Sequence, residues 1–165
     1  MIINLNLGYK MFKNIKNYIK IVLIFLFIVS FSKNIIAQEF GNKEEALVLL
    51  ERAVALVKED KNRALDLFTN GNGGLHPKDL YPFCMTNNGV LIAHPTSIGL
   101  NITGLKDSTG KAVGQEMMSI AKYGEVNEVD FMIARLTTGD TKEYKKTQLV
   151  TMVSNIICVV GYYTE

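Results

Sequence analysis

The chain of 165 residues is long enough for one domain preceded by a short additional segment. It carries 18 basic and 16 acidic residues, a formal net charge of +2, and two cysteines. Five of the basic residues and none of the acidic ones precede Gln38, so the remainder has 13 basic against 16 acidic residues, a net charge of −3. A mildly acidic domain without a basic cluster excludes a nucleic-acid-binding protein, which needs cations against phosphate.

Residues 1–37 have the order of a secretory signal peptide: four lysines, an apolar run over Ile21–Phe31, and small residues up to Ala37. As a helix the apolar run covers about 16 Å, roughly half of a ~30 Å hydrocarbon core. We therefore predict cleavage near Ala37 and a secreted or periplasmic domain of residues 38–165. The alternatives are an uncleaved segment that anchors the domain to the inner membrane, and a translation start at Met11.

The two cysteines, Cys84 and Cys158, are predicted to form a disulfide, because a cysteine pair in an exported protein usually oxidises. Closing a loop of this length stabilises a small domain by about 4 kcal/mol on the chain-entropy model. Two buried thiols are the alternative. The chain has no CxxC motif and no Cys/His spacing typical of structural zinc or haem attachment, so we expect neither a metal nor a cofactor.

A long amphipathic helix is predicted at the start of the domain. Asn42 and Glu45 have the spacing of a capping box, and apolar residues then recur every three or four positions. The pattern falters around Asp60 and resumes as a shorter segment that includes Phe68. The glycine-rich stretch 70–74 ends the helical region.

Five strands and one short helix are predicted after these glycines. The strand candidates are 80–86, 90–94, 125–134, 144–153 and 156–163, and the helix candidate is 113–123. The last strand is apolar on both faces, which predicts a central position in the sheet. The first and last strands can then lie side by side, with Cys84 opposite Cys158. The sequence thus predicts an α+β fold around a five-stranded antiparallel sheet.

Four segments together resemble the single Cache domain, the PAS-like extracellular sensor domain of bacterial chemoreceptors and histidine kinases. They are EEALVLLERAVALVKED, YPFCMTNNGVLIAHP, LKDSTGKAVGQEMM and ICVVGYY, in this order within residues 44–163. The resemblance implies a PAS-like sheet with a long N-terminal helix and a short helix over the sheet. It also implies that the domain binds a small organic anion, commonly a carboxylate, and passes the signal to a membrane receptor or kinase.

Carried over to this chain, the resemblance places ligand contacts at Tyr81, His94, Lys146 and Tyr162. His94 could donate a hydrogen bond to a carboxylate, more strongly when protonated; the alternative is a histidine bonded to loop backbone. Arg135 is a further cation that could bind an anion in bidentate fashion, and a solvated position in a turn is its alternative.

The chain departs from the family pattern at several places. Ile133 and Ala134 stand where a tryptophan-proline pair is common, and Leu149 stands where an aromatic residue is common, so we expect a more aliphatic pocket. The chain also ends at Glu165 without a second membrane helix or a signalling domain, which is typical of a free-standing Cache protein rather than a receptor.

Two other classes of function were weighed. Cys84 and His94 could form the thiol–imidazole pair of an enzyme, but they fall on different strands and the chain has no GxSxG, HExxH or phosphate-binding glycine motif. We therefore predict no enzymatic activity. The second alternative is an interaction subunit of an envelope complex, bound through helix 42–68. Charged residues interrupt any seven-residue repeat in that helix, so a monomer or weak dimer is expected.

Overall fold

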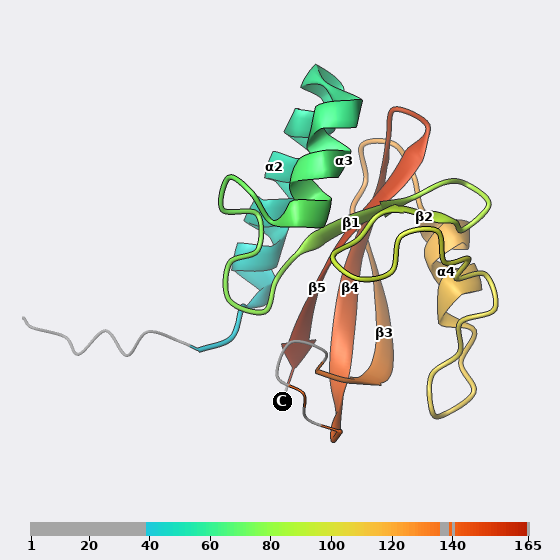
Figure 1. Cartoon of the computed structure of the whole chain (residues 1–165). Coiled ribbons are helices and arrows are strands. Elements are labelled where there is room, and N and C mark those ends of the chain that lie inside the picture. Colours follow the sequence, from blue (N-terminus) through green and yellow to red (C-terminus); the bar gives the residue numbers. More distant parts are fainter. Residues whose placement is uncertain (1–38, 136–138, 140, 165) are drawn as a thin grey trace, which may run out of the picture. The chain divides into compact units, whose positions relative to one another are not determined.

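The computed structural model describes residues 39–135, 139 and 141–164; the predicted leader lies outside them. Two helices precede a five-stranded antiparallel sheet, and a third helix lies between the second and third strands (Figure 1). The elements are α2 (Lys43–Glu59), α3 (Lys61–Asn70), β1 (Pro82–Met85), β2 (Leu91–Ala93), α4 (Val113–Ile120), β3 (Asn127–Ala134), β4 (Glu143–Val153) and β5 (Ile156–Thr164). The predicted α+β fold is confirmed.

Helix α2 begins at the predicted capping box. The Asn42 side chain accepts a hydrogen bond from the Glu45 backbone N–H at 2.9 Å, and the Glu45 carboxylate accepts one from the Asn42 N–H at 3.2 Å. Asp60 has an extended backbone that ends α2, and its carboxylate accepts from the Arg63 N–H at 3.1 Å, which caps α3. Gly71 ends α3 in the left-handed conformation that glycine adopts without strain.

The strand order of the sheet is β2-β1-β5-β4-β3, with every neighbouring pair antiparallel. Strand β5 is therefore central, as its apolar character on both faces predicted. The first and last strands are hydrogen-bonded to each other, and Cys84 lies directly opposite Cys158.

The sheet has two faces with different covers (Figure 1). Helices α2 and α3 cover one face, which we call the helix face; α4 and the connection between β2 and α4 cover the other, which we call the pocket face. Successive residues of a strand alternate between faces. On β5, Val160 and Tyr162 pack with the helices, whereas Ile157 and Val159 pack with α4.

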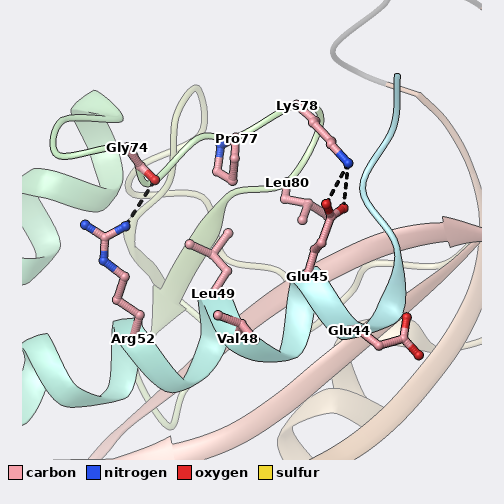
Figure 2. Close-up of a pocket in the computed structure, with 9 residues that line it drawn as sticks. All are labelled: Glu44, Glu45, Val48, Leu49, Arg52, Gly74, Pro77, Lys78 and Leu80. Carbon is pink, nitrogen blue, oxygen red and sulfur yellow. Dashed lines mark hydrogen bonds and ion pairs between the residues drawn. The ribbon is translucent and has the colours of Figure 1, made fainter. Parts of the chain in front are cut away.

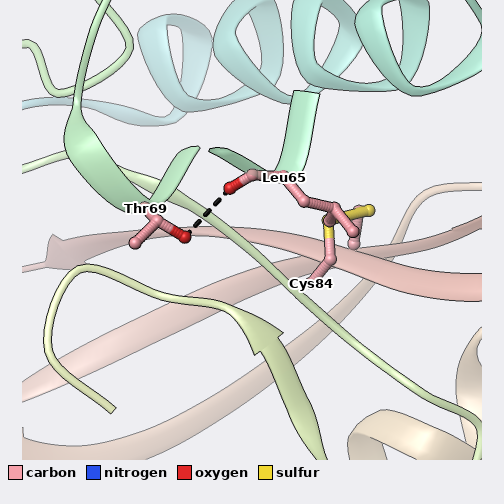
Figure 3. Close-up of a disulfide and its surroundings, with 4 residues drawn as sticks. Leu65, Thr69 and Cys84 are labelled. Carbon is pink, nitrogen blue, oxygen red and sulfur yellow. Dashed lines mark hydrogen bonds between the residues drawn. A yellow bond between two sulfur atoms is a disulfide. The ribbon is translucent and has the colours of Figure 1, made fainter. Parts of the chain in front are cut away.

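The predicted disulfide joins Cys84 and Cys158 across the β1–β5 pair, at a sequence separation of 74. Both cysteines are fully buried on the helix face. Leu65 of α3 lies over Cys84, and Thr69 donates a hydrogen bond to the Leu65 carbonyl one turn earlier (Figure 3). The disulfide therefore fixes the centre of the sheet beneath α3.

The described elements belong to one compact unit, Gln38–Glu165. None of the helices within the described residues combines the length and the apolar character needed to cross a membrane.

Candidate ligand-binding site

A cavity of about 150 Å³ lies on the pocket face. Its walls come from β1, β2, β3, β4, α4 and the connection between β2 and α4, and most of the residues that line it are aliphatic or aromatic. Its polar lining residues are Tyr81, His94, Ser97, Lys146 and Gln148. No aspartate or glutamate lines it. Three of the five residues predicted from sequence, Tyr81, His94 and Lys146, are thus brought together here.

Lys146 and Gln148 share the pocket face because they stand two positions apart on β4. Gly161 of β5 lies opposite Gln148. A Cβ atom on Gly161 would come within 2.6 Å of Lys146 Cε and 2.5 Å of Gln148 Oε1. The absence of a side chain at Gly161 therefore leaves the space in which both long side chains lie over the sheet.

Lys146 is a buried cation, only 2 % exposed. Its Nζ lies 3.5 Å from the Tyr163 hydroxyl and 5.0 and 4.6 Å from the ring centres of Tyr81 and Tyr163. Burial lowers the pKa of Lys146 to about 8, with Asp79 opposing this shift and Arg135 adding to it. Lys146 is therefore mostly protonated at neutral pH, yet within the described residues it forms no ion pair.

His94 lies beside the rings of Tyr81 and Phe83, at centroid distances of 5.4 and 5.5 Å. Its Nδ1 accepts a hydrogen bond from the Thr96 backbone N–H at 3.1 Å, so in the neutral ring the proton is on Nε2. Burial, with Lys146 and His76 nearby, lowers the pKa of His94 to about 4. One nitrogen of His94 thus binds loop backbone, and the other is a neutral N–H donor.

Arg135 is buried rather than solvated, and it lies outside the cavity lining. Its Nη1 is 3.6 Å from Asp79 Oδ2, and its guanidinium carbon lies 3.5 Å from the centre of the Phe40 ring. Asp79 Oδ1 also accepts a hydrogen bond from the Gly41 N–H at 2.7 Å. Sequence reasoning missed Asp79. This buried pair ties the end of β3 to the segment that leads into α2.

Tyr162 also lies outside the cavity, and here the predicted placement needs correction. It shares the parity of Cys158 and Val160 along β5, so its ring belongs to the helix face, where it packs with α2. The next residue, Tyr163, is on the pocket face, opposite Lys146 in the β4–β5 register. Tyr163 is therefore the tyrosine of β5 whose hydroxyl reaches the Lys146 ammonium.

Asp107 fixes the connection that covers the cavity. Its Oδ1 accepts hydrogen bonds from the backbone N–H groups of Thr109 and Lys111, and its Oδ2 accepts one from Met132 N–H on the edge strand β3. The hydrogen bond from the Thr109 hydroxyl, together with those from the backbone, lowers the pKa of Asp107 to about 2. From sequence this residue was only part of a turn; in the structure it attaches the cover to the sheet.

Two larger hollows flank α2, but their polar groups are already paired or lie at the rim. The first, about 350 Å³, lies between α2 and the segment before β1 (Figure 2). There Lys78 forms an ion pair with Glu45 at 2.7 Å, and Arg52 donates to the carbonyl of Gly74 at 3.3 Å. The second, about 490 Å³, opens between α2 and residues 123–126. Thr151, a buried polar residue in the lining of the second hollow, already donates its hydroxyl hydrogen to the Lys122 carbonyl at 3.4 Å.

The thiol–imidazole pair considered from sequence cannot form. The Cys84 sulfur is held in the disulfide on the helix face, whereas His94 lies in the cavity on the pocket face. In the part of the chain that the structure describes, no three His, Cys, Asp or Glu side chains are grouped so that they could hold a metal ion.

The family profile described as Cache domain matches residues 11–165 of this sequence. The chain belongs to the Cache domain family. Its fold is similar to that of a methyl-accepting chemotaxis protein from Vibrio parahaemolyticus, with a TM-score of 0.58 at 19 % identity over 73 % of this chain and 87 % of that one. No protein of curated function matches the chain.

Two further solved structures share this Cache fold. One is a periplasmic sensor domain of a chemotaxis protein, with a TM-score of 0.56 at 20 % identity over 74 % of this chain and 90 % of that one. The other is a Cache chemosensory domain described for its carboxylic acid recognition, with a TM-score of 0.55 at 23 % identity over 74 % and 88 %. At these identities the likeness establishes the fold, which is the PAS-like fold that the sequence resemblance implied. Cache domains are sensor domains.

Proposed function

We propose that this Cache domain is an extracytoplasmic sensor that binds a small carboxylate in the cavity on the pocket face. The observation that carries the proposal is Lys146, a buried and mostly protonated amine beside a cavity with no acidic lining residue. Removing a charge from water is costly unless an opposite charge compensates it. A bound anion supplies that charge.

Taken together, the charges around the cavity favour binding of an anion. Lys146 and Arg135 are both buried cations, and Asp79 is the buried carboxylate near them. Because Asp79 is paired with Arg135, the cluster retains one positive charge. The neutral Nε2–H of His94 and the hydroxyl of Tyr81 add hydrogen-bond donors that suit carboxylate oxygens.

The size of the cavity limits the ligand to a few carbon atoms. Pockets for drug-sized ligands have volumes of roughly 300–1,000 Å³, and this cavity has about 150 Å³. Its aliphatic and aromatic walls suit a short alkyl group, while the Lys146 end suits the charged group. The related chemosensory domain described for carboxylic acid recognition supports the same class of ligand.

In this proposal Lys146, His94 and Tyr81 contact the ligand directly. Arg135 contributes positive charge from behind the cavity, and Tyr162 supports the sheet from its other face. The leader predicted in residues 1–37 places the domain outside the cytoplasm. A membrane receptor or kinase then reads the ligand-bound state.

A thermal-shift series tests the proposal on the purified chain at constant ionic strength, with formate, acetate, propionate and butyrate against matched chloride and methylammonium salts. A ligand at 100 times its dissociation constant stabilises the folded state by about 2.7 kcal/mol, which raises the melting temperature visibly. We expect at least one short carboxylate to do so and the ammonium salts to have no effect. If every carboxylate leaves the melting temperature unchanged, the proposal is wrong.

The second candidate is an interaction protein without a small ligand, and the hollow beside α2 is the observation that favours it. Val48 is 65 % exposed in the middle of this helix, at the floor of the 350 Å³ hollow (Figure 2). A partner docked there would be displaced by Val48→Glu, measured by pull-down from envelope extracts. This candidate function is supported if that variant loses a partner and no carboxylate binds the parent chain.

A further inference from the structure

The side chain of Gln148 is a buried polar group that the protein leaves unbonded. Gln148 is 5 % exposed and lines the cavity. Its Oε1 atom is fully shielded from solvent and has no hydrogen-bond partner, and none of the described residues bonds the other end of its amide. Buried amides are normally bonded at both ends, so an amide left unbonded in a cavity points to a missing partner.

A plain carboxylate cannot fully supply this partner. The Lys146 ammonium and the His94 Nε2–H can only donate, and the Tyr81 hydroxyl is a further donor. The Ser97 hydroxyl already shares a hydrogen bond with the Thr96 hydroxyl at 3.1 Å, and a carboxylate offers acceptors only. Gln148 Oε1 is an acceptor and needs a donor. Rotation about the broad terminal torsion of the side chain can turn this oxygen toward the cavity. The ligand must therefore carry a donor in addition to its carboxylate.

The donor is a hydroxyl rather than an ammonium group. An ammonium group would add a positive charge near Lys146 and Arg135 without a carboxylate in the lining to neutralise it. A hydroxyl is neutral, and it both donates and accepts, so it can meet either end of the Gln148 amide. Gln148 stands two residues from Lys146 on the same face of β4, which places the hydroxyl next to the carboxylate.

We infer that Gln148 makes the cavity selective for short 2-hydroxy carboxylates over the corresponding unsubstituted, keto and amino acids. This inference rests on the proposed function, because it assumes that the carboxylate binds at Lys146. It adds the second functional group of the ligand and the residue that recognises it.

Four ligands with the same three-carbon skeleton test the inference: lactate in both enantiomers, propionate, pyruvate and alanine. Their affinities for the purified chain are measured by isothermal titration calorimetry. We expect one enantiomer of lactate to bind about tenfold more tightly than propionate and pyruvate, the effect of one satisfied buried hydrogen bond, and alanine to bind most weakly.

Gln148→Leu assigns the preference to this residue. We expect the variant to bind lactate and propionate with nearly equal affinity, and to keep the affinity of the parent for propionate. Gln115→Leu, on an exposed position of α4, is the matched control and should keep the tenfold ratio.

The outcomes separate the inference from the proposed function. If propionate or pyruvate binds the parent chain as tightly as lactate, the selectivity inference is wrong while the carboxylate proposal stands. A lactate preference that survives in Gln148→Leu also overturns it. If none of the four ligands binds, the selectivity inference is wrong, and the proposed function fails with it only if formate, acetate and butyrate also leave the melting temperature unchanged. The comparison among ligands on the parent chain does not depend on whether the variant folds.

Discussion

The two faces of the sheet differ in how their buried groups are paired. On the helix face, the buried polar groups have partners: the Thr147 hydroxyl donates to Asp130 at 2.6 Å, and the Thr151 hydroxyl to the Lys122 carbonyl at 3.4 Å. On the pocket face, no carboxylate among the described residues pairs with Lys146, and none of these residues forms a hydrogen bond with either end of the Gln148 amide. One face therefore accounts for stability, and the other retains the unmet interactions that a ligand can satisfy.

Two adjacent lysines on β4 show the contrast most directly. Lys145 points toward the helix face near the start of β4, where it is exposed and its ammonium lies 2.7 Å from Asp130. The hydrogen bond to Asp130 raises the pKa of Lys145, whereas burial lowers that of Lys146. The lysine at position 145 thus forms a surface ion pair, whereas the lysine at position 146 is a buried cation. Strand register, rather than residue type, therefore decides which of the two lysines lies at the cavity.

We expect the largest effect on stability from loss of the disulfide on the helix face, and little effect on carboxylate binding. Replacing both Cys84 and Cys158 by alanine removes a link that closes a 74-residue separation, and should lower the free energy of unfolding by about 4 kcal/mol. Because the disulfide lies on the helix face, carboxylate affinity measured well below the melting temperature should stay within twofold of the parent. Urea denaturation measures the free energy of unfolding, and calorimetry measures the carboxylate affinity. A large loss of affinity would show that the two faces are coupled.

Asp79→Asn should have the next largest effect, at the buried pair that Asp79 forms with Arg135. The substitution removes the carboxylate beside Arg135 and should lower the free energy of unfolding by about 3 kcal/mol, because it breaks a buried ion pair. The same change removes a negative charge near Lys146, so affinity for a carboxylate should rise severalfold. Asp66→Asn, on the exposed side of α3, is the control and should change neither quantity by more than about 0.5 kcal/mol.

A drop in both stability and affinity for Asp79→Asn would contradict this assignment. It would indicate that the pair with Arg135 holds the shape of the cavity, and that its charge matters less than its geometry.

Lys146→Met should reduce carboxylate affinity by about 100-fold, because the ligand loses its buried counter-charge. The ligand-free variant should be more stable than the parent by about 1 kcal/mol, since an apolar side chain replaces a buried charge. Lys145→Met is the matched control. It removes an exposed ion pair one residue away and should alter affinity by less than twofold.

If the two lysine variants lose affinity equally, the contrast between the two faces fails as an account of binding. Calorimetry gives the affinities, and thermal melting of the ligand-free proteins gives the stabilities.

The sequence was sufficient for most of the fold because its signals are local or depend on a single pairing. The Asn42 capping box, the Asp60 break and the apolar last strand each predicted an element that the structure contains. The cysteines added the β1–β5 pairing. These features need no knowledge of what lies across the sheet.

The site was less predictable because cavity lining depends on face and register. The resemblance places a ligand contact at Tyr162, but this residue lies on the same face of β5 as Cys158. Tyr163 faces Lys146 instead. Gln148 was missed, although its position two residues after Lys146 was a usable signal. Arg135 had no such signal, because its partner Asp79 is 56 positions away and only the folded chain brings them together.

The smallest effect that we predict is the pH dependence of binding, and it tests whether the charge on Lys146 is what the ligand recognises. Below its pKa of about 8 the amine is already protonated, so affinity should be nearly constant from pH 6 to 7.5. Above pH 8 a carboxylate must bring a proton onto the amine when it binds, and affinity should fall by up to tenfold for each pH unit.

The other titratable groups in the cavity should not mask this decline. The pKa of His94 is lowered to about 4, so the ring stays neutral throughout this range, and burial raises the pKa of Tyr81, so the phenol stays protonated. Calorimetry in buffers of different ionisation enthalpy measures the proton uptake at pH 8.5, which should vanish in Lys146→Met. An affinity that stays flat to pH 9.5 would mean that neutral donors hold the carboxylate, and that the pocket face differs from the helix face in hydrogen bonding rather than in charge.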